Sequence, residues 1–181
     1  ARVVAVDQSA ERMARLKSNL ERLKLTAETV VADVGSWQPG KLFDAILIDA
    51  PCTATGTIRR HPDILYLKRR DDIAALTRIQ AGILEGAARL LKPGGRMVFC
   101  TCSLEPEEGP DQIDAFLARH PEFARMPIDP ALIGGMTNLV TEQGELRTLP
   151  SQLDDSAPGL QGLDGFFAAC LAHLTGVVES I

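Results

Sequence analysis

The 181-residue chain lacks several features that mark common functional classes. It has only three histidines, and its four cysteines, Cys52, Cys100, Cys102 and Cys170, form no CxxC pair. A zinc site or a disulfide framework is therefore poorly supported, and we expect no metal. No apolar run approaches the roughly 20 residues that span a bilayer, and the first residues do not resemble a secretion signal. We expect a soluble, cytoplasmic protein that contacts no membrane.

Positive charge is scarce as well, with 19 Lys and Arg against 24 Asp and Glu and a net charge of -5. This balance argues against a positive field over the whole surface, but it leaves room for a local basic patch. The densest cationic segment is made of Arg59, Arg60, His61, Lys68, Arg69 and Arg70. On charge alone, contact with a polyanion and a solvated helix face balanced by nearby aspartates are equally good interpretations. Contact is favoured because the segment closely follows residues 49–52, which carry other candidate functional groups.

Strand-like and helix-like segments alternate along the chain. Apolar and β-branched runs at residues 2–6, 29–32, 43–48 and 96–102 predict strands. Apolar residues at helical spacing predict helices after Ser9, over residues 72–91 and over residues 105–120, with residues 92–95 ending the second. Residues 121–143 read as a loop, and residues 145–149 and 165–174 as two strands that pair as an antiparallel edge. The alternation predicts an α/β fold with a mostly parallel sheet.

Four polar side chains lie at the ends of the predicted parallel strands: Asp7, Asp33, Asp49 and Cys102. Ligands of such folds bind beyond the carboxyl ends of the strands, so topology alone brings these residues toward one site. A carboxylate can accept hydrogen bonds from two vicinal ribose hydroxyls, and Asp7 is the best candidate for that contact. The alternative is that Asp7 caps the following helix or is simply solvated. Asp33 has weaker support as a binding residue.

Two of the cysteines occupy positions where a thiol can react. Cys52 and Cys102 each follow a predicted strand, where a loop or a helix N-terminus can lower the pKa of a thiol. Taken singly, each is more often a small buried residue, which is also our interpretation of Cys100 and Cys170 inside strands. Two thiols at neighbouring strand ends favour a shared cleft, because packing alone requires neither of them there.

Four segments carry a resemblance to a known family: VVAVDQS, LIDAPCTATGTIRRHPD, LKPGGRMVFCTCSLEPEE and GLDGFFAACL. Together they are similar to the RNA cytosine-5 methyltransferases of the Sun/RsmB (Fmu) type, which depend on S-adenosylmethionine. The combination of Asp-Ala-Pro-Cys with Thr-Cys-Ser is highly specific, whereas a strand ending in Asp is widespread. The resemblance implies a Rossmann-like class I methyltransferase sheet with an antiparallel C-terminal edge. It places the catalytic domain over residues 1–175, followed by a tail at residues 176–181.

The resemblance also implies a role for each candidate residue. Asp7 would hold the ribose hydroxyls of S-adenosylmethionine, Asp33 would lie by its adenine, and Asp49 would lie between the cofactor and the target base. Cys102 would be the nucleophile, with Asp49 donating to the ring nitrogen as an acid and Cys52 assisting product release. Enzymes that methylate cytosine in DNA take their nucleophile from the position of Cys52. The choice of Cys102 therefore rests on the resemblance.

The basic tail of the same loop, Arg59, Arg60 and His61, would face the phosphate backbone of an RNA substrate. A target base must leave its stack to reach a thiol, which favours single-stranded or looped RNA. The resemblance makes ribosomal RNA a better candidate than transfer RNA. Neither the modified cytosine nor the oligomeric state follows from the sequence.

The sequence departs from the family at its start. The family's first strand and its glycine-rich loop should precede Arg2 and are absent, as is the amino-terminal RNA-binding portion. That strand lies between the strands that end at Asp7 and Asp49, so we expect an N-terminally incomplete fold with a central gap in the sheet. We also expect the chain to be a fragment that, on its own, binds S-adenosylmethionine weakly or not at all.

Three alternatives stay open beside RNA methylation. The first is a methyltransferase of the same fold that acts on DNA cytosine or on an exocyclic amine, although an amine enzyme needs no thiol and DAPC does not match its motif. The second is a noncatalytic RNA-binding or assembly module that retains the fold, against which the two retained thiols argue. The third is a cysteine hydrolase, for which His61, His120 and His173 offer no recognisable arrangement.

Overall fold

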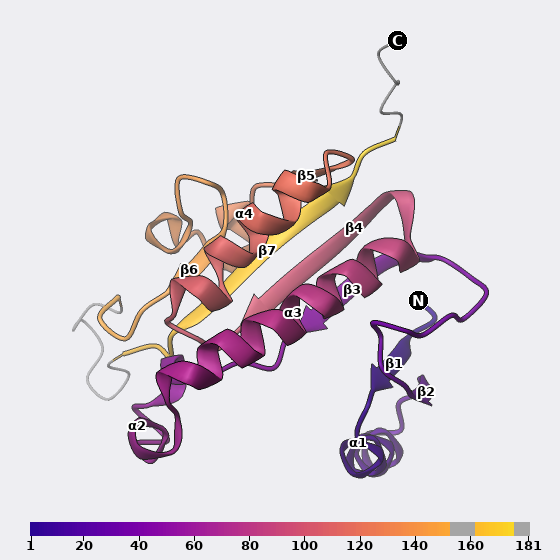
Figure 1. Ribbon diagram of the computed structural model, residues 1–181, viewed down its shortest axis with the longest axis horizontal. Helices are drawn as coiled ribbons and strands as arrows, with labels where there is room; N and C mark the ends of the chain where they lie inside the picture. The colour runs from indigo at the N-terminus through magenta and orange to yellow at the C-terminus, as the bar shows by residue number, and fades with distance from the viewer. Residues whose placement is uncertain (153–161, 176–181) are drawn as a thin grey trace. The chain divides into compact units, whose positions relative to one another are not determined.

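The computed structural model describes residues 1–152 and 162–175, so the tail expected at residues 176–181 lies outside the described residues. The chain divides into two compact units, Ala1–Lys41 and Leu42–Ile181 (Figure 1). A single catalytic domain over residues 1–175 stays a prediction. Within the described residues, no helix is both long and apolar enough to cross a membrane.

The first unit is a β-α-β segment. Strand β1 (Val4–Asp7) leads into helix α1 (Ala10–Leu23), and strand β2 (Glu28–Val31) pairs with β1 in parallel. Ser9 begins the helix as predicted, because its side chain accepts the backbone N–H of Arg12. The helix ends at Lys24, which adopts the left-handed conformation with φ 55°. Both strands are confirmed, each within two residues of its predicted bounds.

The second unit is built on a five-stranded sheet. Strands β3 (Phe43–Asp49) and β4 (Leu91–Thr101) are parallel, and β7 (Phe166–His173) runs antiparallel to β4. The other edge of β7 is shared by two short antiparallel strands, β5 (Phe123–Arg125) and β6 (Leu146–Thr148). The Rossmann-like α/β fold with its antiparallel C-terminal edge is confirmed. Among the described residues, β1–β2 and β3–β4–β7–β5 form two separate sheets, one in each unit.

Helices and turns connect these strands. They are η1 (Thr55–Thr57), α2 (Ile64–Leu67), α3 (Arg70–Leu90), η2 (Pro106–Glu108), α4 (Pro110–Arg119), η3 (Pro130–Ile133) and η4 (Thr137–Leu139). Helix α3 runs along β3 and β4, and α4 lies beside it in front of β7 (Figure 1). One face of the sheet is therefore covered by the two longest helices of this unit.

The core of the second unit lies between this face of the sheet and the two helices. Alternate residues of β4 and β7, among them Met97, Phe99 and Leu171, are fully buried in one cluster with Leu84 of α3 and Phe116 of α4. Truncating one such aromatic side chain to Ala typically costs about 3–5 kcal/mol. The loops that follow β3 and β4 are therefore attached to strands that are held in place by a well-packed core.

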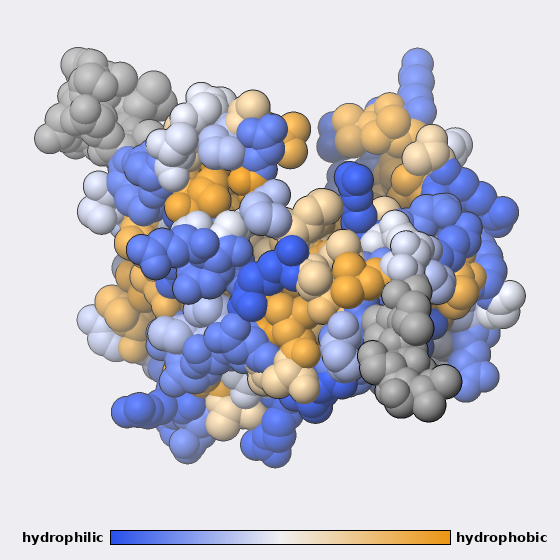
Figure 2. Space-filling view, turned by 90° about the horizontal axis from the view of Figure 1, so that it is seen from above, coloured by the Kyte–Doolittle hydropathy of each residue, from blue (hydrophilic) through white to orange (hydrophobic). Residues whose placement is uncertain are grey.

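Apolar side chains also reach the surface. In the view of Figure 2, hydrophobic residues appear among the hydrophilic ones. Leu47 of β3 is 72% exposed and alternates with the buried Ile48, so it lies on the face of the sheet opposite to α3. Tyr66 of α2 is 86% exposed.

Three segments differ from their predicted form. The helix expected over residues 105–120 is divided into η2 and α4 at Gly109, whose backbone (φ -134°, ψ -107°) is not helical. Pro110 explains the break, because proline disfavours the helical conformation of the residue before it. Strand β4 begins at Leu91 rather than at residue 96, and its register with β3 is irregular over residues 92–95. The predicted loop at residues 121–143 contains β5, which is too short to show a periodic pattern.

Candidate active site

The candidate site forms where two adjacent parallel strands end. Asp49, the last residue of β3, pairs with Cys100 near the end of β4. The chain after β3 turns back to the end of β4, where the N–H of Gly56 donates to Cys102 O (2.9 Å). The Sγ atoms of Cys52 and Cys102 consequently lie 3.5 Å apart, although the residues are 50 positions apart in sequence. The structure thus brings together the two thiols that the sequence places at neighbouring strand ends.

This contact separates the acidities of the two thiols. The hydrogen bond from Cys52 lowers the pKa of Cys102 to about 7, whereas burial acts in the opposite direction. The same hydrogen bond raises the pKa of Cys52, and burial adds to the rise. Cys102 therefore ionises first and carries a large thiolate fraction at neutral pH. Because the thiolate is the nucleophilic form, the electrostatics favour Cys102 as the reactive sulfur and Cys52 as the sulfur that keeps its proton.

The other two cysteines have the properties of structural thiols. Cys100 Sγ donates to Ile48 O (3.2 Å), and burial raises its pKa to about 11. Cys170 lies within β7, and burial raises its pKa as well. Both stay protonated at neutral pH, which agrees with their interpretation as small strand residues.

The loop after Cys52 depends on close backbone contacts. Gly56 O accepts the N–H of Gly165 (2.8 Å), so the loop lies against the segment that leads into β7. A Cβ atom on Gly56 would lie 2.0 Å from Gly165 O, closer than side chains approach. Just before it, Ala54 adopts the left-handed conformation with φ 61°, which costs a non-glycine residue roughly 1–2 kcal/mol. Such a conformation persists because the contacts around it hold it in place.

Hydroxyl groups link the two loops that carry the thiols. Ser103 Oγ lies 3.2 Å from Thr53 Oγ1 and 3.3 Å from Thr55 Oγ1. Arg147 of β6 donates to the carbonyl oxygens of Ser103 (2.9 Å) and Leu104 (2.8 Å). These partners lie 43 to 50 residues apart along the chain, so no local pattern in the sequence predicts them.

Two buried polar side chains near the loops that carry Cys52 and Cys102 were also not predicted from the sequence. Gln80 of α3 and Glu108 of η2 are both fully buried, and both contact the residues that flank Cys52. Nothing in the sequence separates Glu108 from Glu105 and Glu107, which lie in the same short acidic segment. Only the fold shows which of the three carboxylates turns inward.

Asp49 is exposed at the end of β3. In its ionised form it adds to the rise that burial causes in the pKa of Cys100, and it opposes in part the lowering of the pKa of Cys102. The structure therefore brings Asp49 within electrostatic range of Cys100 and Cys102. Within the described residues, no group of three His, Cys, Asp or Glu side chains is placed to hold a metal ion.

The basic residues predicted to contact RNA follow η1. Arg59, Arg60 and His61 are all exposed. Arg60 Nε donates to Asp164 Oδ2 (2.6 Å), and this hydrogen bond raises the pKa of the guanidinium. Arg60 is thus held against the segment before β7, close to the Gly56–Gly165 contact.

Two further candidates lie in the first unit, where β1 and β2 end side by side. Asp7 Oδ1 accepts the Ser9 N–H (2.7 Å), and both Asp7 oxygens accept from Arg12 at 2.8 Å. The hydrogen bond from Arg12 lowers the pKa of Asp7. Asp33 Oδ1 accepts the Gly35 N–H (2.9 Å) just beyond β2. The contact of Asp7 with the following helix agrees with the alternative interpretation of this residue, and its use as a ligand stays a prediction.

Comparison with known proteins places the chain in a family. Residues 1–172 match the family described as 16S rRNA methyltransferase RsmB/F. The ribosomal RNA small subunit methyltransferase B of Vibrio cholerae is 42% identical over 173 residues, which cover 94% of this chain and 36% of the relative. The protein of the same name from Sodalis glossinidius is 46% identical over 178 residues, covering 93% of this chain and 36% of the relative.

A solved structure agrees with these sequence relatives. The methyltransferase homolog protein from Pyrococcus horikoshii has a TM-score of 0.70 and 30% identity, and the match covers 96% of this chain and 54% of that one. The resemblance to RNA methyltransferases of the Sun/RsmB type is confirmed, whereas the roles of the individual site residues stay predictions. The chain, which spans 36% of the length of the two curated relatives, belongs to the RsmB/F family of 16S rRNA methyltransferases.

Proposed function

We propose that this protein methylates carbon 5 of cytosine in ribosomal RNA, with S-adenosylmethionine as methyl donor and Cys102 as covalent nucleophile. The observation that carries the proposal is the pair of sulfur atoms 3.5 Å apart, of which Cys102 ionises near pH 7 while Cys52 keeps its proton. The relatives from Vibrio cholerae and Sodalis glossinidius are named for methylation of small-subunit ribosomal RNA. The activity is proposed for the whole protein, which would meet its RNA substrate in the cytoplasm.

Carbon 5 of cytosine is a weak nucleophile, and covalent addition changes this. The thiolate of Cys102 would add to carbon 6, so that a C–S bond forms and the ring electrons shift toward the ring nitrogen. Asp49, in its protonated form, would donate a proton to that nitrogen, which stabilises the developing charge and leaves carbon 5 in an enamine. The Asp49 carboxylate would take this proton back when the ring is restored. When bound, S-adenosylmethionine supplies the methyl group that carbon 5 takes up.

Product release requires a base, and Cys52 would act as one. Its raised pKa depends first on its hydrogen bond to Cys102, then on burial and on the charge of Cys102. Once the Cys102 sulfur is bonded to carbon 6, the first and third causes disappear, so the Cys52 thiol can lose its proton to water. Cys52 would then take the proton from carbon 5, directly or through water, as the C–S bond breaks and its electrons return to Cys102. The resting pair of thiol and thiolate is thereby restored.

The donor set of the first unit fits a nucleoside. Arg12, the side-chain partner of Asp7, is 62% exposed at its side chain and can move aside. A carboxylate offers about four acceptor positions, of which the Asp7 contacts occupy three. Asp7 would therefore accept from the ribose hydroxyls, with Asp33 beside the adenine. For Asp49, a role in binding S-adenosylmethionine is proposed on the family resemblance alone.

The surface after η1 would bind the RNA. The basic residues Arg59, Arg60 and His61 are followed by α2, in which Tyr66 is 86% exposed, and then by further exposed cations. Phosphates bind cationic side chains, and unstacked bases bind exposed aromatic rings. A combination of both favours a single-stranded or looped substrate.

The test is methyl transfer from labelled S-adenosylmethionine to ribosomal RNA, with transfer RNA and DNA as competing substrates. Cys102→Ala should abolish transfer, and Cys52→Ala should accumulate an RNA–protein adduct that survives denaturation. Cys170→Ala serves as the matched control, because this thiol lies outside the pair, and it should retain transfer.

Other outcomes would assign a different function. Loss of transfer with Cys52→Ala but not with Cys102→Ala would move the nucleophile to the position used by DNA methyltransferases. RNA binding by the wild-type protein without any transfer would favour the noncatalytic module.

A further inference from the structure

The two residues that flank Cys52 are held by two buried side chains from different elements. Gln80 Nε2 of α3 donates to Pro51 O (2.9 Å). Glu108 of η2 accepts the Thr53 N–H at both carboxylate oxygens (3.0 and 3.1 Å) and also accepts the Thr53 hydroxyl. Gln80 Nε2 donates to Glu108 Oε1 as well (3.2 Å), which joins the two supports. Hydrogen bonds therefore hold in place the residue before Cys52 and the residue after it.

The side chains that make these contacts are buried, so a polar group among them that lacks a partner is costly. Gln80 and Glu108 are 0% exposed, and Thr53 is 1% exposed. A buried carboxylate needs several donors, and Glu108 obtains them from Thr53 and Gln80. Gln80 Oε1, by contrast, is buried without a partner among the described residues. The Gln80 amide is thus oriented so that its N–H groups donate to Pro51 and Glu108, while its oxygen accepts no hydrogen bond.

The same support reaches the second thiol. Thr101 Oγ1 donates to the backbone oxygen of Glu108 (3.1 Å), and Thr101 directly precedes Cys102. Ser103, which directly follows Cys102, contacts Thr53 Oγ1 through its hydroxyl (3.2 Å). Glu108 therefore contacts Thr53, which follows Cys52, and Thr101, which precedes Cys102. We expect the distance between the two sulfur atoms to depend on Glu108.

We propose that Gln80 and Glu108 are positioning residues that hold Cys52 against Cys102 for the release step of the reaction. This inference rests on the proposed function, in which Cys52 takes the proton from carbon 5. Neither side chain touches the substrate; both act through Pro51 and Thr53. Without the contacts of Gln80 and Glu108, Cys102 should still add to carbon 6 of the cytosine. The covalent adduct should break down more slowly, as it should when Cys52 itself is replaced.

The first measurement is independent of catalysis. An azo oxidant such as diamide takes two electrons from a thiol pair, so that Cys52 and Cys102 lose their protons, an S–S bond forms and the oxidant becomes a hydrazine. Because the two Sγ atoms start 3.5 Å apart, the rate of this disulfide reports their placement. Displacement by about 1 Å can slow a positioned reaction by up to about 100-fold. Gln80→Leu should therefore form the disulfide about 10- to 100-fold more slowly, as mapped by mass spectrometry.

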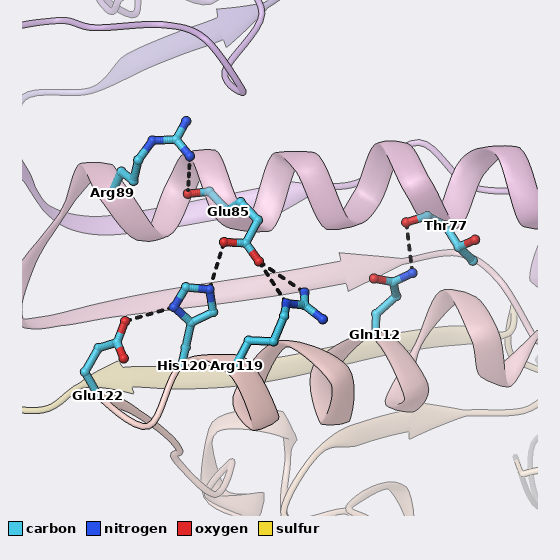
Figure 3. A network of polar contacts seen from close by, with 7 residues as sticks. All are labelled: Thr77, Glu85, Arg89, Gln112, Arg119, His120 and Glu122. Carbon is cyan, nitrogen blue, oxygen red and sulfur yellow. Dashed lines mark hydrogen bonds and ion pairs between the residues drawn. The ribbon is translucent and has the colours of Figure 1, made fainter.

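The second measurement follows the RNA adduct on denaturing gels. Gln80→Leu should accumulate adduct during turnover, as Cys52→Ala does. The matched control is Gln112→Leu, since Gln112 is also a buried glutamine that donates across helices, but to Thr77 O (3.0 Å) rather than to a residue that flanks Cys52 (Figure 3). It should behave as wild type in both assays. If Gln80→Leu fails to fold, Thr53→Val removes the hydroxyl contact with Glu108 at nearly constant volume and takes its place.

The outcomes separate this inference from the proposed function. Wild-type disulfide rates and no adduct in Gln80→Leu and Thr53→Val would overturn the positioning role. Slower disulfide formation in Gln80→Leu, with no adduct even in Cys52→Ala, would support the positioning of Cys52 and refute its proposed part in release.

Discussion

Replacing Gly56 with Ala should destabilise the second unit strongly. The new Cβ would lie 2.0 Å from Gly165 O, 2.6 Å from Gly165 C and 2.8 Å from Cys102 O. The backbones must therefore separate by about 1 Å, which stretches the 2.8 Å hydrogen bond from Gly165 N to Gly56 O beyond the usual limit of about 3.2 Å. Overpacking typically costs about 1–3 kcal/mol, and a lost hydrogen bond adds about 1 kcal/mol. We expect a loss of about 2–4 kcal/mol in the free energy of unfolding.

Gly82→Ala provides the matched control for this substitution. Gly82 lies within α3, and a Cβ there would meet nothing within 4 Å. Because alanine is the better helix former, this change should stabilise the protein by up to about 1 kcal/mol. Urea unfolding of both variants measures the difference, and Gly56→Ala should also lower the melting temperature by roughly 4–16 °C. Equal unfolding midpoints for Gly56→Ala and wild type would refute the close approach of the two loops.

Three further predictions concern charge and surface. When protonated, His120 donates to the carboxylates of Glu85 (2.8 Å) and Glu122 (2.9 Å) (Figure 3). Burial lowers the pKa of His120, but the two carboxylates raise it on balance above 6.5. The ion pairs of His120 should contribute fully to stability below about pH 6.5, the pKa of the unfolded state, and their contribution should be lost as the pH rises through the pKa of the folded state. His120→Gln should therefore reduce the pH dependence of the urea unfolding midpoint between about pH 6 and 8. An unchanged pH dependence would contradict this. The rate at which iodoacetamide alkylates Cys102 should rise with pH around a midpoint of about 7. Cys52→Ala should shift that midpoint to higher pH, because it removes the hydrogen bond that lowers the pKa of Cys102. An unchanged midpoint would exclude the contact between the two thiols. Tyr66→Ala should weaken binding of single-stranded RNA by about 1–3 kcal/mol while Tyr66→Phe retains it, and equal affinities would rule out base stacking on this ring.

Much of the fold follows from local patterns in the sequence. Ser9 marks the start of α1, and the β-branched runs mark β1 to β4, because capping and strand propensity act over a few residues. The thiol pair is foreseeable for a different reason. Parallel strands end at one edge, so topology alone brings Cys52 and Cys102 into the same region.

The support of the site, by contrast, depends on contacts that no short window contains. Gln80 lies 29 residues from Pro51, and Glu108 lies 55 residues from Thr53. In sequence, Glu108 is one of several neighbouring acidic residues, and its inward orientation arises only when η2 and α3 pack together. The short strand β5 exists because β7 offers it an open edge, which is equally a property of the assembled sheet.

The contact between Gly56 and Gly165 bears on how the protein is made. Strand β7 pairs with β4 and follows Gly165 directly, so the segment that steadies the thiol loop is synthesised about 70 residues after Cys102. At roughly 5–20 residues per second, a ribosome needs about 4–14 s to add that stretch. During this interval the nascent chain carries both cysteines without the strand that completes their surroundings. We expect the thiol pair to acquire its separate acidities only after β7 has been synthesised and has paired with β4.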